Sequence, residues 1–587
     1  MILKTLGAQV REFKRDSFMT PVFMIGEVIM ETIIPLLMAS IIDNGVNGND
    51  GSGDMNHIYL IGCLMIVAAL ASLTFGIMGG KYGSRASAGF AKNLRKAMYE
   101  NIQTFSFSNI DKFSTSGLVT RLTTDVTNMQ NAYMMILRMC MRAPSTLICA
   151  MAMAFFISPR LASIYLIAVI LLACVLAVIV SQATKHFMQA FPKYDALNES
   201  VQENVSAIRV VKAYVREGYE IEKFKNASNN IYKIFSKAEK IVIWNSPVMS
   251  FTVYTCILVI SWVGAHMVVQ EALTTGQLMS LMTYCMNILM SLMMLSMIFV
   301  MVTMSVASAR RICEVLNEKA DLDNPEKPFS EVKDGSIVFE HVSFRYKKDA
   351  EAPVLKDINL EIKSGETIGI IGGTGSAKSS LVNLVSRLYD VTEGRLLVGG
   401  RDVKDYDMEA LRNQVAVVLQ NNVLFSGTIL ENLRWGDKEA TEEECRHACE
   451  LACADEFIQK MPDGYNTYIE QGGTNVSGGQ KQRLCIARAL LKKPKVLILD
   501  DSTSAVDTAT DAKIRKAFAE AIPGTTKLII AQRISSVEHA DRIIVMHDGE
   551  IDGFGSHEEL LETNEIYREV YEAQISGSGD FDEKGGM

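Results

Sequence analysis

Long apolar segments dominate the first half of the chain. Six of them exceed the roughly 20 residues needed to cross a bilayer. They lie at about 18–43, 57–82, 130–157, 161–182, 246–269 and 276–306. The first is too long for a secretory signal and lacks a small-residue cleavage site. From residue 335 to about 570 the pattern changes to the shorter runs of a soluble α/β domain. The sequence therefore predicts a polytopic α-helical membrane domain fused to an α/β domain.

The distribution of Lys and Arg predicts the orientation of these spans. The N-terminal segment and the connections 83–129 and 183–245 are rich in basic residues, whereas 44–57 and 270–275 contain none. Because basic loops stay in the cytoplasm, we expect a multi-pass protein of the cell membrane whose N-terminus and α/β domain are cytoplasmic. The two long connections keep a helical periodicity, so we expect helices that extend beyond the bilayer and reverse at tips near 106–116 and 213–217.

A phosphate-binding loop pattern starts at Gly372, between a strand-like run, 367–371, and a helix-like run from Ser380. In such a loop, backbone N–H groups surround the phosphates, Lys378 reaches the β/γ oxygens and Ser379 binds Mg²⁺. The residues assigned to this loop are Gly373, Thr374, Gly375, Ser376, Ala377, Lys378, Ser379 and Ser380. Taken alone, this pattern is common to many ATPases.

Two further motifs make the signal specific. An apolar strand, 497–499, leads into Asp500, whose carboxylate can hold Mg²⁺ through its water shell. About twenty residues before Asp500 lies a Ser-Gly-Gly-Gln motif, formed by Ser477, Gly478, Gly479 and Gln480. The combination resembles the nucleotide-binding domain of ABC transporters, and the six spans with long helical extensions resemble an exporter-type half-transporter of that family.

The resemblance implies a domain organisation and a set of ligands. It predicts a six-helix membrane domain at 1–310, a linker at 311–334, a nucleotide-binding domain at 335–573 and a disordered tail at 574–587. It implies that the two tips are coupling helices that dock on ATPase domains. The ligands implied are ATP and Mg²⁺, and the partners are the lipid bilayer, a transported substrate and a second half-transporter.

Other site residues are assigned by the same resemblance. Tyr346 is expected to stack on adenine, although a strand aromatic in the core is the alternative. Gln420 corresponds to the Gln that senses Mg²⁺. Ser477 is expected to complete the ATP site of the partner, because two such domains meet head to tail. Ala377 replaces the last Gly before the P-loop Lys, and we expect it to adopt a helix-start conformation at little cost.

Two residues depart from the family pattern. Asp501 stands where the family carries the Glu that activates water, and Gln532 stands where it carries the switch His. Asp is one methylene shorter than Glu, and a carboxylate that cannot reach the water is a poor base. Gln cannot acquire the positive charge of His. Ordinary sequence drift is the alternative, but both changes affect one reaction. We therefore expect a degenerate, slow ATP site and a heterodimer whose partner supplies the missing groups.

The charged residues and the methionines inside the spans can each be interpreted in two ways. Glu27 and Glu31 lie four residues apart in the first span, and Arg138 and Arg142 have the same spacing in the third. They either brace two helices, which we favour, or contact substrate. The last span is dense in Met, which suits either a surface that repacks around varied ligands or a simple membrane filler.

The net charge of −9, without a basic stripe, argues against a nucleic-acid partner. The leading function is an ATP-driven exporter that moves amphipathic or drug-like small molecules, lipids or peptides out of the cytoplasm, and the substrate stays open. An ATP-gated channel or regulatory subunit is the alternative, and a soluble ABC protein acting on translation is excluded by the six spans.

Overall fold

The protein forms two compact units. The structure is a computed structural model that describes residues 2–48, 53–347, 350–502 and 506–575. The helical unit comprises Met1–Thr104 and Phe113–Glu318, and the α/β unit comprises Phe105–Lys112 and Lys319–Met587. Most of the predicted tail, 576–587, lies outside the described residues.

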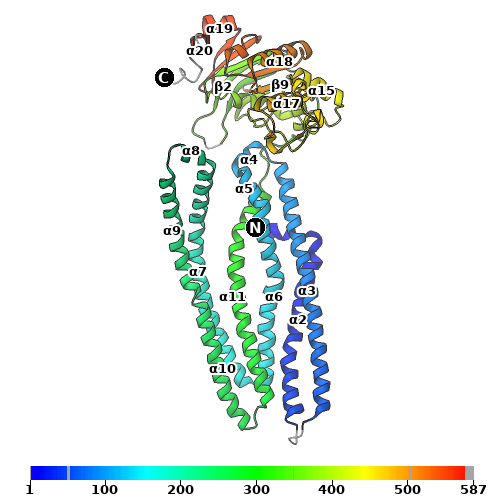
Figure 1. The fold of residues 1–587 in the computed structure, drawn as a ribbon, viewed down its shortest axis with the longest axis vertical. Helices are drawn as coiled ribbons and strands as arrows, with labels where there is room; N and C mark the ends of the chain where they lie inside the picture. The colour runs from blue at the N-terminus through cyan, green and yellow to red at the C-terminus, as the bar shows by residue number, and fades with distance from the viewer. Residues whose placement is uncertain (1, 49–52, 348–349, 503–505, 576–587) are drawn as a thin grey trace. The chain divides into compact units, whose positions relative to one another are not determined.

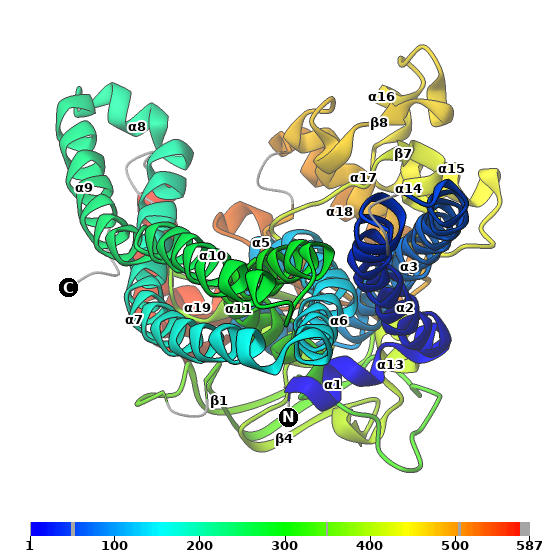
Figure 2. The same cartoon turned by 90° about the horizontal axis from the view of Figure 1, so that it is seen from below.

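Among the described residues, seven long helices build the helical unit. They are α2 Lys14–Ser40, α3 Met55–Gln103, α6 Val126–Ile157, α7 Pro159–Ser206, α9 Glu217–Val242, α10 Asn245–Val269 and α11 Thr275–Asn317. Shorter elements are α1 Ile2–Ala8, η1 Arg11–Phe13, α5 Thr115–Thr120, α8 Ile208–Ala213 and the π-helical segments η2 Ile41–Val46 and η3 Arg121–Asp125. Within this unit, α6 and α11 lie between the α2–α3 pair and the α7–α10 pair (Figures 1 and 2).

The described residues contain six helical stretches long and apolar enough to span a membrane. They are Arg11–Val46, Met55–Gln103, Thr115–Ile157, Pro159–His186, Glu217–Val269 and Thr275–Phe299. Large apolar side chains on them, such as Leu171 and Trp262, are exposed, as expected of surfaces that face lipid. The 49 residues of α3 give roughly 70 Å of helix, which is more than twice the bilayer core. The predicted six-span fold class is confirmed.

Helix ends follow local capping rules. Asp54 accepts hydrogen bonds from the backbone N–H groups of Asn56 and His57 at the start of α3. Thr274 and Gln277 form a capping box at the start of α11. At the predicted tips, α4 Phe107–Phe113 lies within 106–116, and α8 is followed by a short turn that leads into α9 at Glu217.

A predicted charge pair joins two spans. Arg142 of α6 donates from Nη1 to Glu27 Oε1 at 2.7 Å and from Nη2 to Glu31 Oε1 at 2.9 Å, both on α2. These contacts confirm the expected Glu–Arg brace. Glu27 Oε2 and Arg138 Nε are buried without a hydrogen-bond partner among the described residues. Whether any of these side chains also contacts substrate stays a prediction.

Methionines line one face of α11. Met279, Met286, Met290, Met293, Met297 and Met301 are exposed. Leu281, Tyr284 and Ile288 on the opposite face are buried in the helical core. The spacing of three, four and seven residues places the exposed methionines on one helical stripe.

The α/β unit is built on three sheets. Their strands are β1 Ile337–Phe344, β2 Leu355–Ile362, β3 Thr367–Gly372, β4 Glu393–Val398, β5 Arg401–Asp402, β6 Val415–Val418, β7 Gly427–Thr428, β8 Tyr468–Ile469, β9 Val496–Asp500, β10 Thr526–Ile530, β11 Arg542–His547 and β12 Glu550–Gly555. The largest sheet has the order β12-β11-β3-β10-β9-β6 and is parallel except for β12. An antiparallel sheet has the order β2-β1-β4-β5.

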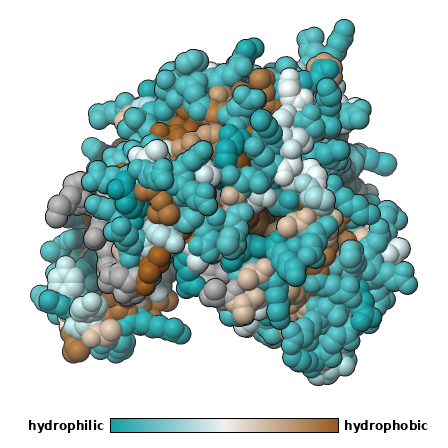
Figure 3. Space-filling view, turned by 90° about the horizontal axis from the view of Figure 1, so that it is seen from above, coloured by the Kyte–Doolittle hydropathy of each residue, from teal (hydrophilic) through white to brown (hydrophobic). Residues whose placement is uncertain are grey.

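Helices cover these sheets, and the exterior is largely hydrophilic. The principal helices are α12 Lys378–Val385, α13 Met408–Gln414, α14 Ile429–Leu433, α15 Glu442–Leu451, α16 Asp455–Ile458, α17 Gly478–Leu490, α18 Thr508–Ala521, α19 His557–Thr563 and α20 Glu565–Ile575. Every residue of β9 and β10 is buried, which matches the apolar runs 496–499 and 528–530 within them. The face seen in Figure 3 is mostly hydrophilic, with hydrophobic side chains in small separate groups.

Candidate ATP site

Three neighbouring parallel strands bring the predicted motifs to one edge of the sheet. β10 lies between β3 and β9, and Ile530 is paired with both Ile370 and Asp500. The carboxyl ends of parallel strands share one edge, so the loop after β3, the carboxylates after β9 and the segment after β10 lie together. A Cβ at Gly372, which has φ +155°, would lie 2.2 Å from Met546 O, so this first turn requires glycine.

The P-loop wraps around the Lys378 side chain. Lys378 Nζ donates to Gly372 O and Gly373 O, each at 2.7 Å, and lies 3.3 Å from Ser376 Oγ. The ammonium group therefore sits inside the loop, where the phosphate oxygens of a nucleotide would replace the carbonyls as its partners. Gly375, with φ +86°, has no atom within 4 Å of a Cβ, so only its backbone conformation demands glycine there.

Ala377 corrects one prediction. The residue has φ +71° and ψ +21°, a left-handed conformation directly before α12, and not the helix-start conformation expected from the sequence. A side chain in this region costs about 1 kcal/mol relative to glycine. The methyl group packs against the hydrophobic cluster of the α/β unit, which offsets part of this cost. The substitution therefore strains the loop without blocking its amides.

Asp500 and Ser379 form a paired oxygen site. Ser379 Oγ donates to Asp500 Oδ1 at 3.0 Å. Burial raises the pKa of Asp500, while the Ser379 hydrogen bond and the nearby Lys378 charge oppose this shift. A hydroxyl and a carboxylate oxygen at this separation are hard donors of the kind Mg²⁺ prefers, so the residues fit the metal.

The two departures from the family pattern contact each other. Gln532 Nε2 donates to Asp501 Oδ2 at 3.0 Å, and Gln420 also hydrogen-bonds the Asp501 carboxylate. Asp501 has φ +47°, and its N–H donates to Ile530 O at 3.2 Å. Burial, and then the neighbouring Asp500 charge, raise the pKa of Asp501. The short carboxylate is therefore held between two amide side chains.

The Tyr346 side chain lies beside the first turn of α12. Its OH is 2.8 Å from Ser380 Oγ, and its ring packs edge-on against Tyr389 with centroids 5.1 Å apart. The side chain is partly exposed, so one face stays accessible. This position beside the P-loop is compatible with the expected adenine contact, which stays a prediction.

The Ser-Gly-Gly-Gln motif forms a regular helix start. Ser477 Oγ accepts from Gln480 N at 3.3 Å, and Gln480 Oε1 accepts from Ser477 N at 2.9 Å, which makes a capping box for α17. Ser477 and Gly478 are exposed, and Gly479 is half-buried. The hydroxyl and the first amides of a 13-residue helix therefore face outward, as an anion site requires.

One supporting residue had no sequence signal. Gln574 of α20 donates from Nε2 to Gln532 O at 3.1 Å and accepts from Ile534 N at 2.9 Å. These bonds fix the backbone on both sides of Arg533 and so orient Gln532. Ser504 and Ala505, which follow β9 in the chain, lie outside the described residues.

The fold and this edge define a membrane-spanning P-loop ATPase. Residues 17–293 match the ABC transporter transmembrane region, and residues 355–504 match the ABC transporter ATPase family. The chain is 36% identical over 559 residues to an uncharacterised ABC transporter ATP-binding protein, YfiB, of Bacillus subtilis, covering 95% of this chain and 96% of that one.

Two further relatives extend the comparison. An ATP-dependent lipid A-core flippase of Desulfotalea psychrophila is 31% identical over 525 residues, covering 88% of this chain and 91% of the other. The structure of a bacterial Atm1-family ABC exporter with ATP bound superposes with a TM-score of 0.83 at 23% identity, covering 96% and 99% of the two chains, and supports the fold. The chain belongs to the ABC transporter family, as an exporter-type half-transporter with its membrane domain fused to its ATPase domain.

Proposed function

We propose that this chain is the degenerate-site half of a heterodimeric ABC exporter. The observation that carries the proposal is the hydrogen bond between Gln532 and Asp501. In the family pattern, these positions hold the Glu and His that serve hydrolysis. Here the shorter Asp501 carboxylate accepts hydrogen bonds from two side-chain amides, one of Gln532 and one of Gln420.

Binding and hydrolysis separate at this site. Lys378, Ser379 and Asp500 keep the geometry that ATP binding needs. Ser379 and Asp500, with Gln420 nearby, would hold Mg²⁺, which neutralises phosphate charge when bound. A base must lie within hydrogen-bond reach of the attacking water, and Asp501 reaches one methylene less far than Glu. The chain's own P-loop site therefore binds ATP and turns it over slowly.

The signature half of the chain serves a different site. Half-transporters of this family act as dimers. Ser477 and the exposed start of α17 would complete the partner's P-loop site, where the partner supplies Glu and His. Because the helix start points amides and a hydroxyl outward, it complements the γ-phosphate charge. One working site and one slow site result.

Transport is directed out of the cytoplasm. The basic connections support a cytoplasmic position for the N-terminus, the helical extensions and the ATPase domain. The substrate is a drug-like amphipathic molecule, a lipid or a peptide. The lipid A-core flippase among the relatives favours a lipid, and the exposed methionine face of α11 suits a flexible apolar ligand.

The deciding experiment compares ATP turnover of the purified chain alone with that of the chain co-expressed with its partner. The single chain should bind ATP–Mg²⁺ but hydrolyse it at least about tenfold more slowly than the pair. Equal rates would reject the heterodimer. An active pair that conducts ions passively on ATP binding, without moving any solute uphill, would instead favour the ATP-gated channel.

A further inference from the structure

The chain passes between its two units three times. It leaves the helical unit after Thr104, at the end of α3, and re-enters it at Phe113, just before α5. It leaves again after Glu318, at the end of α11. The first segment is the end of α3, the second is the stretch from Phe113 through η3, and the third is the end of α11. Any motion that one unit imposes on the other through the chain must travel along these three segments. Inside the helical unit, side-chain contacts tie these three segments to each other.

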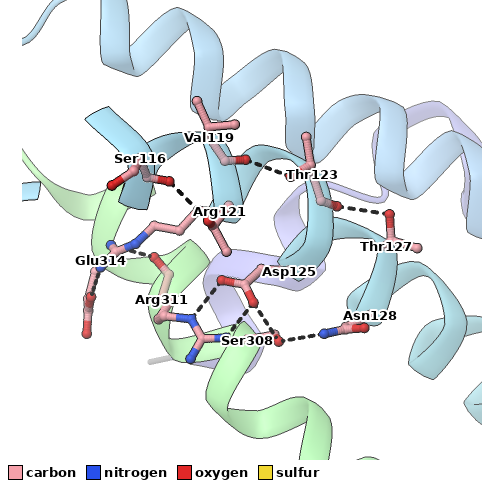
Figure 4. A network of polar contacts seen from close by, with 11 residues as sticks. Ser116, Val119, Arg121, Thr123, Asp125, Thr127, Asn128, Ser308, Arg311 and Glu314 are labelled. Atoms are coloured by element: carbon pink, nitrogen blue, oxygen red, sulfur yellow. Dashed lines mark hydrogen bonds and ion pairs between the residues drawn. The ribbon is translucent and has the colours of Figure 1, made fainter. Parts of the chain in front are cut away.

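A buried carboxylate ties the second segment to the third. Asp125, which ends the π-helical segment η3, has no exposed surface. Its Oδ2 accepts from Arg311 Nε at 2.7 Å, and its Oδ1 accepts from Arg311 Nη2 at 2.5 Å and from Ser308 Oγ at 2.9 Å (Figure 4). Asn128 Nδ2 donates to Ser308 Oγ at 3.3 Å. A two-pronged Arg–carboxylate pair fixes orientation as well as distance, so α6 cannot slide along α11 without breaking it.

Arg121 makes a second connection one turn earlier. Its Nη1 donates to Arg311 O at 3.1 Å, and its Nη2 lies 3.1 Å from Glu314 Oε2. Its guanidinium also lies over the ring of Phe113, 4.8 Å from the centroid. Phe113 is the first residue after re-entry, and its side chain is buried. Arg121 thus joins the point of re-entry to the last turns of α11 (Figure 4).

The first segment is tied to the same place. Asn101, near the end of α3, donates from Nδ2 to Val315 O at 2.7 Å and to Glu318 O at 2.9 Å. These are carbonyls of the last turn of α11 and its cap, which have few helical partners of their own. All three segments therefore converge on residues 308–318.

Two of the residues that make these contacts lie at the ends of the π-helical segment η3, Arg121–Asp125. Arg121 and Asp125 are four residues apart, a spacing that places side chains on one face of a helix, and both face α11 (Figure 4). Short π-helical turns of this kind occur frequently at functional sites.

We propose that Asn101, Arg121, Asp125, Ser308, Arg311 and Glu314 form a coupling clamp that makes the three chain crossings move as one body. Resting on the proposed ATP-driven transport, the clamp transmits nucleotide-driven motion of the α/β unit to the spans of α6 and α11. These are positioning residues, because none of them lies at the ATP site. Without the clamp, ATP is still bound and hydrolysed, but the spans respond weakly.

Hydrogen–deuterium exchange of the assembled transporter in lipid nanodiscs tests this without a known substrate. The probe is ATP with Mg²⁺ and vanadate, and the readout is the change in exchange within residues 126–157 and 275–300. Asp125→Asn should keep ATP turnover within about twofold of the parent while this change shrinks about fivefold or more. Arg311→Lys keeps the charge but not the two-pronged pair, so its response should be intermediate.

A matched control and a second variant complete the design. Arg310, exposed on the same helix, gives the control Arg310→Gln, which should respond like the parent. If Asp125→Asn fails to assemble, Arg121→Gln decides in its place. A full response in these clamp variants, or an equal loss in the control, overturns the clamp. A parent protein that hydrolyses ATP without any response in its spans would reject the exporter itself, and the clamp with it.

Discussion

The chain presents two regions to ATP, and they differ in how closely they keep the family pattern. The edge of the large sheet departs from it at Ala377, Asp501 and Gln532. The start of α17 keeps its pattern and forms a regular capping box. Yet the scaffold under the altered edge is intact, because β3, β9 and β10 are in register and almost fully buried.

The difference implies that, in the proposed mechanism, hydrolysis is slowed at this edge while ATP binding is kept. Asp501 and Gln532 lie beyond the strand ends, where they contact each other, whereas the Ala377 methyl packs against the hydrophobic cluster. The residues that would hold phosphate and Mg²⁺, Lys378, Ser379 and Asp500, keep their mutual contacts. The substitutions that define the proposed slow site therefore leave the scaffold of the fold unchanged.

The largest predicted effect is on ATPase activity, and it compares one mutation at the start of α17 with one at the edge of the large sheet. Ser477→Ala removes a γ-phosphate contact from the partner's working site, so ATPase of the heterodimer should fall by roughly 10- to 100-fold. Removing a transition-state hydrogen-bond donor typically lowers the rate by about 100- to 1000-fold, and the neighbouring glycine amides should make the fall smaller here. Asp501→Asn alters only the slow site and should change turnover by less than about threefold. If Asp501→Asn is the more damaging, Asp501 acts as a base and the asymmetric mechanism is wrong.

A gain of function should follow from restoring both departures together. Asp501→Glu extends the carboxylate, and Gln532→His removes the amide that holds it. We expect ATPase of the single chain to rise about tenfold in the double variant, and by much less in either single variant, because the two side chains act as a unit. Steady-state hydrolysis measures this. Additive gains would show that the two positions are independent.

Much of this organisation is predictable from sequence because it rests on local patterns. Apolar length identifies the six spans, and glycine spacing identifies the P-loop. The Glu–Arg brace follows from matched spacing on two spans, although the sequence does not reveal that Arg142 alone takes both carboxylates.

What the sequence hides depends on distant partners and on backbone angles. Alanine is compatible with a helix start, so the sequence gives no sign that the P-loop holds Ala377 at a φ of +71°. Asp125 lies 186 positions from Arg311, so no local spacing connects them. Gln574, which orients Gln532, lies 42 positions away. Such contacts arise only when the elements pack.

The brace gives a smaller, structural prediction within the helical unit. Glu27 is 12% exposed and Arg142 is 29% exposed, so removing one leaves the other unpaired in a low-dielectric region. Arg142→Met should destabilise the protein by about 2 kcal/mol, and adding Glu27→Leu should recover part of this loss. Thermal unfolding in nanodiscs gives the values. Glu31, which is more exposed, provides the control Glu31→Gln with a weaker effect. Additive losses together with altered transport would favour a substrate contact.

The smallest predicted effect is a change in stability with pH that comes from Asp501, at the altered edge of the sheet. Burial and the nearby Asp500 raise the pKa of Asp501. The folded state therefore binds this proton more readily than the unfolded state, and stability falls as pH rises from the ordinary Asp pKa through the raised one. Above that range the charged carboxylate destabilises the nucleotide-free protein, a cost that Asp501→Asn removes while its amide oxygen still accepts from Gln532.

Thermal unfolding of the nucleotide-free complex should thus show Asp501→Asn about 1–2 °C more stable than the parent at pH 7.5. The gain should shrink as pH falls through the raised pKa and below the ordinary Asp pKa of about 4, because the parent carboxylate is then protonated in both states. A variant less stable at pH 7.5 would mean that the hydrogen bonds from Gln532 and Gln420 outweigh the cost of burial. The carboxylate would then stabilise the altered edge, and its retention would need no role in ATP turnover.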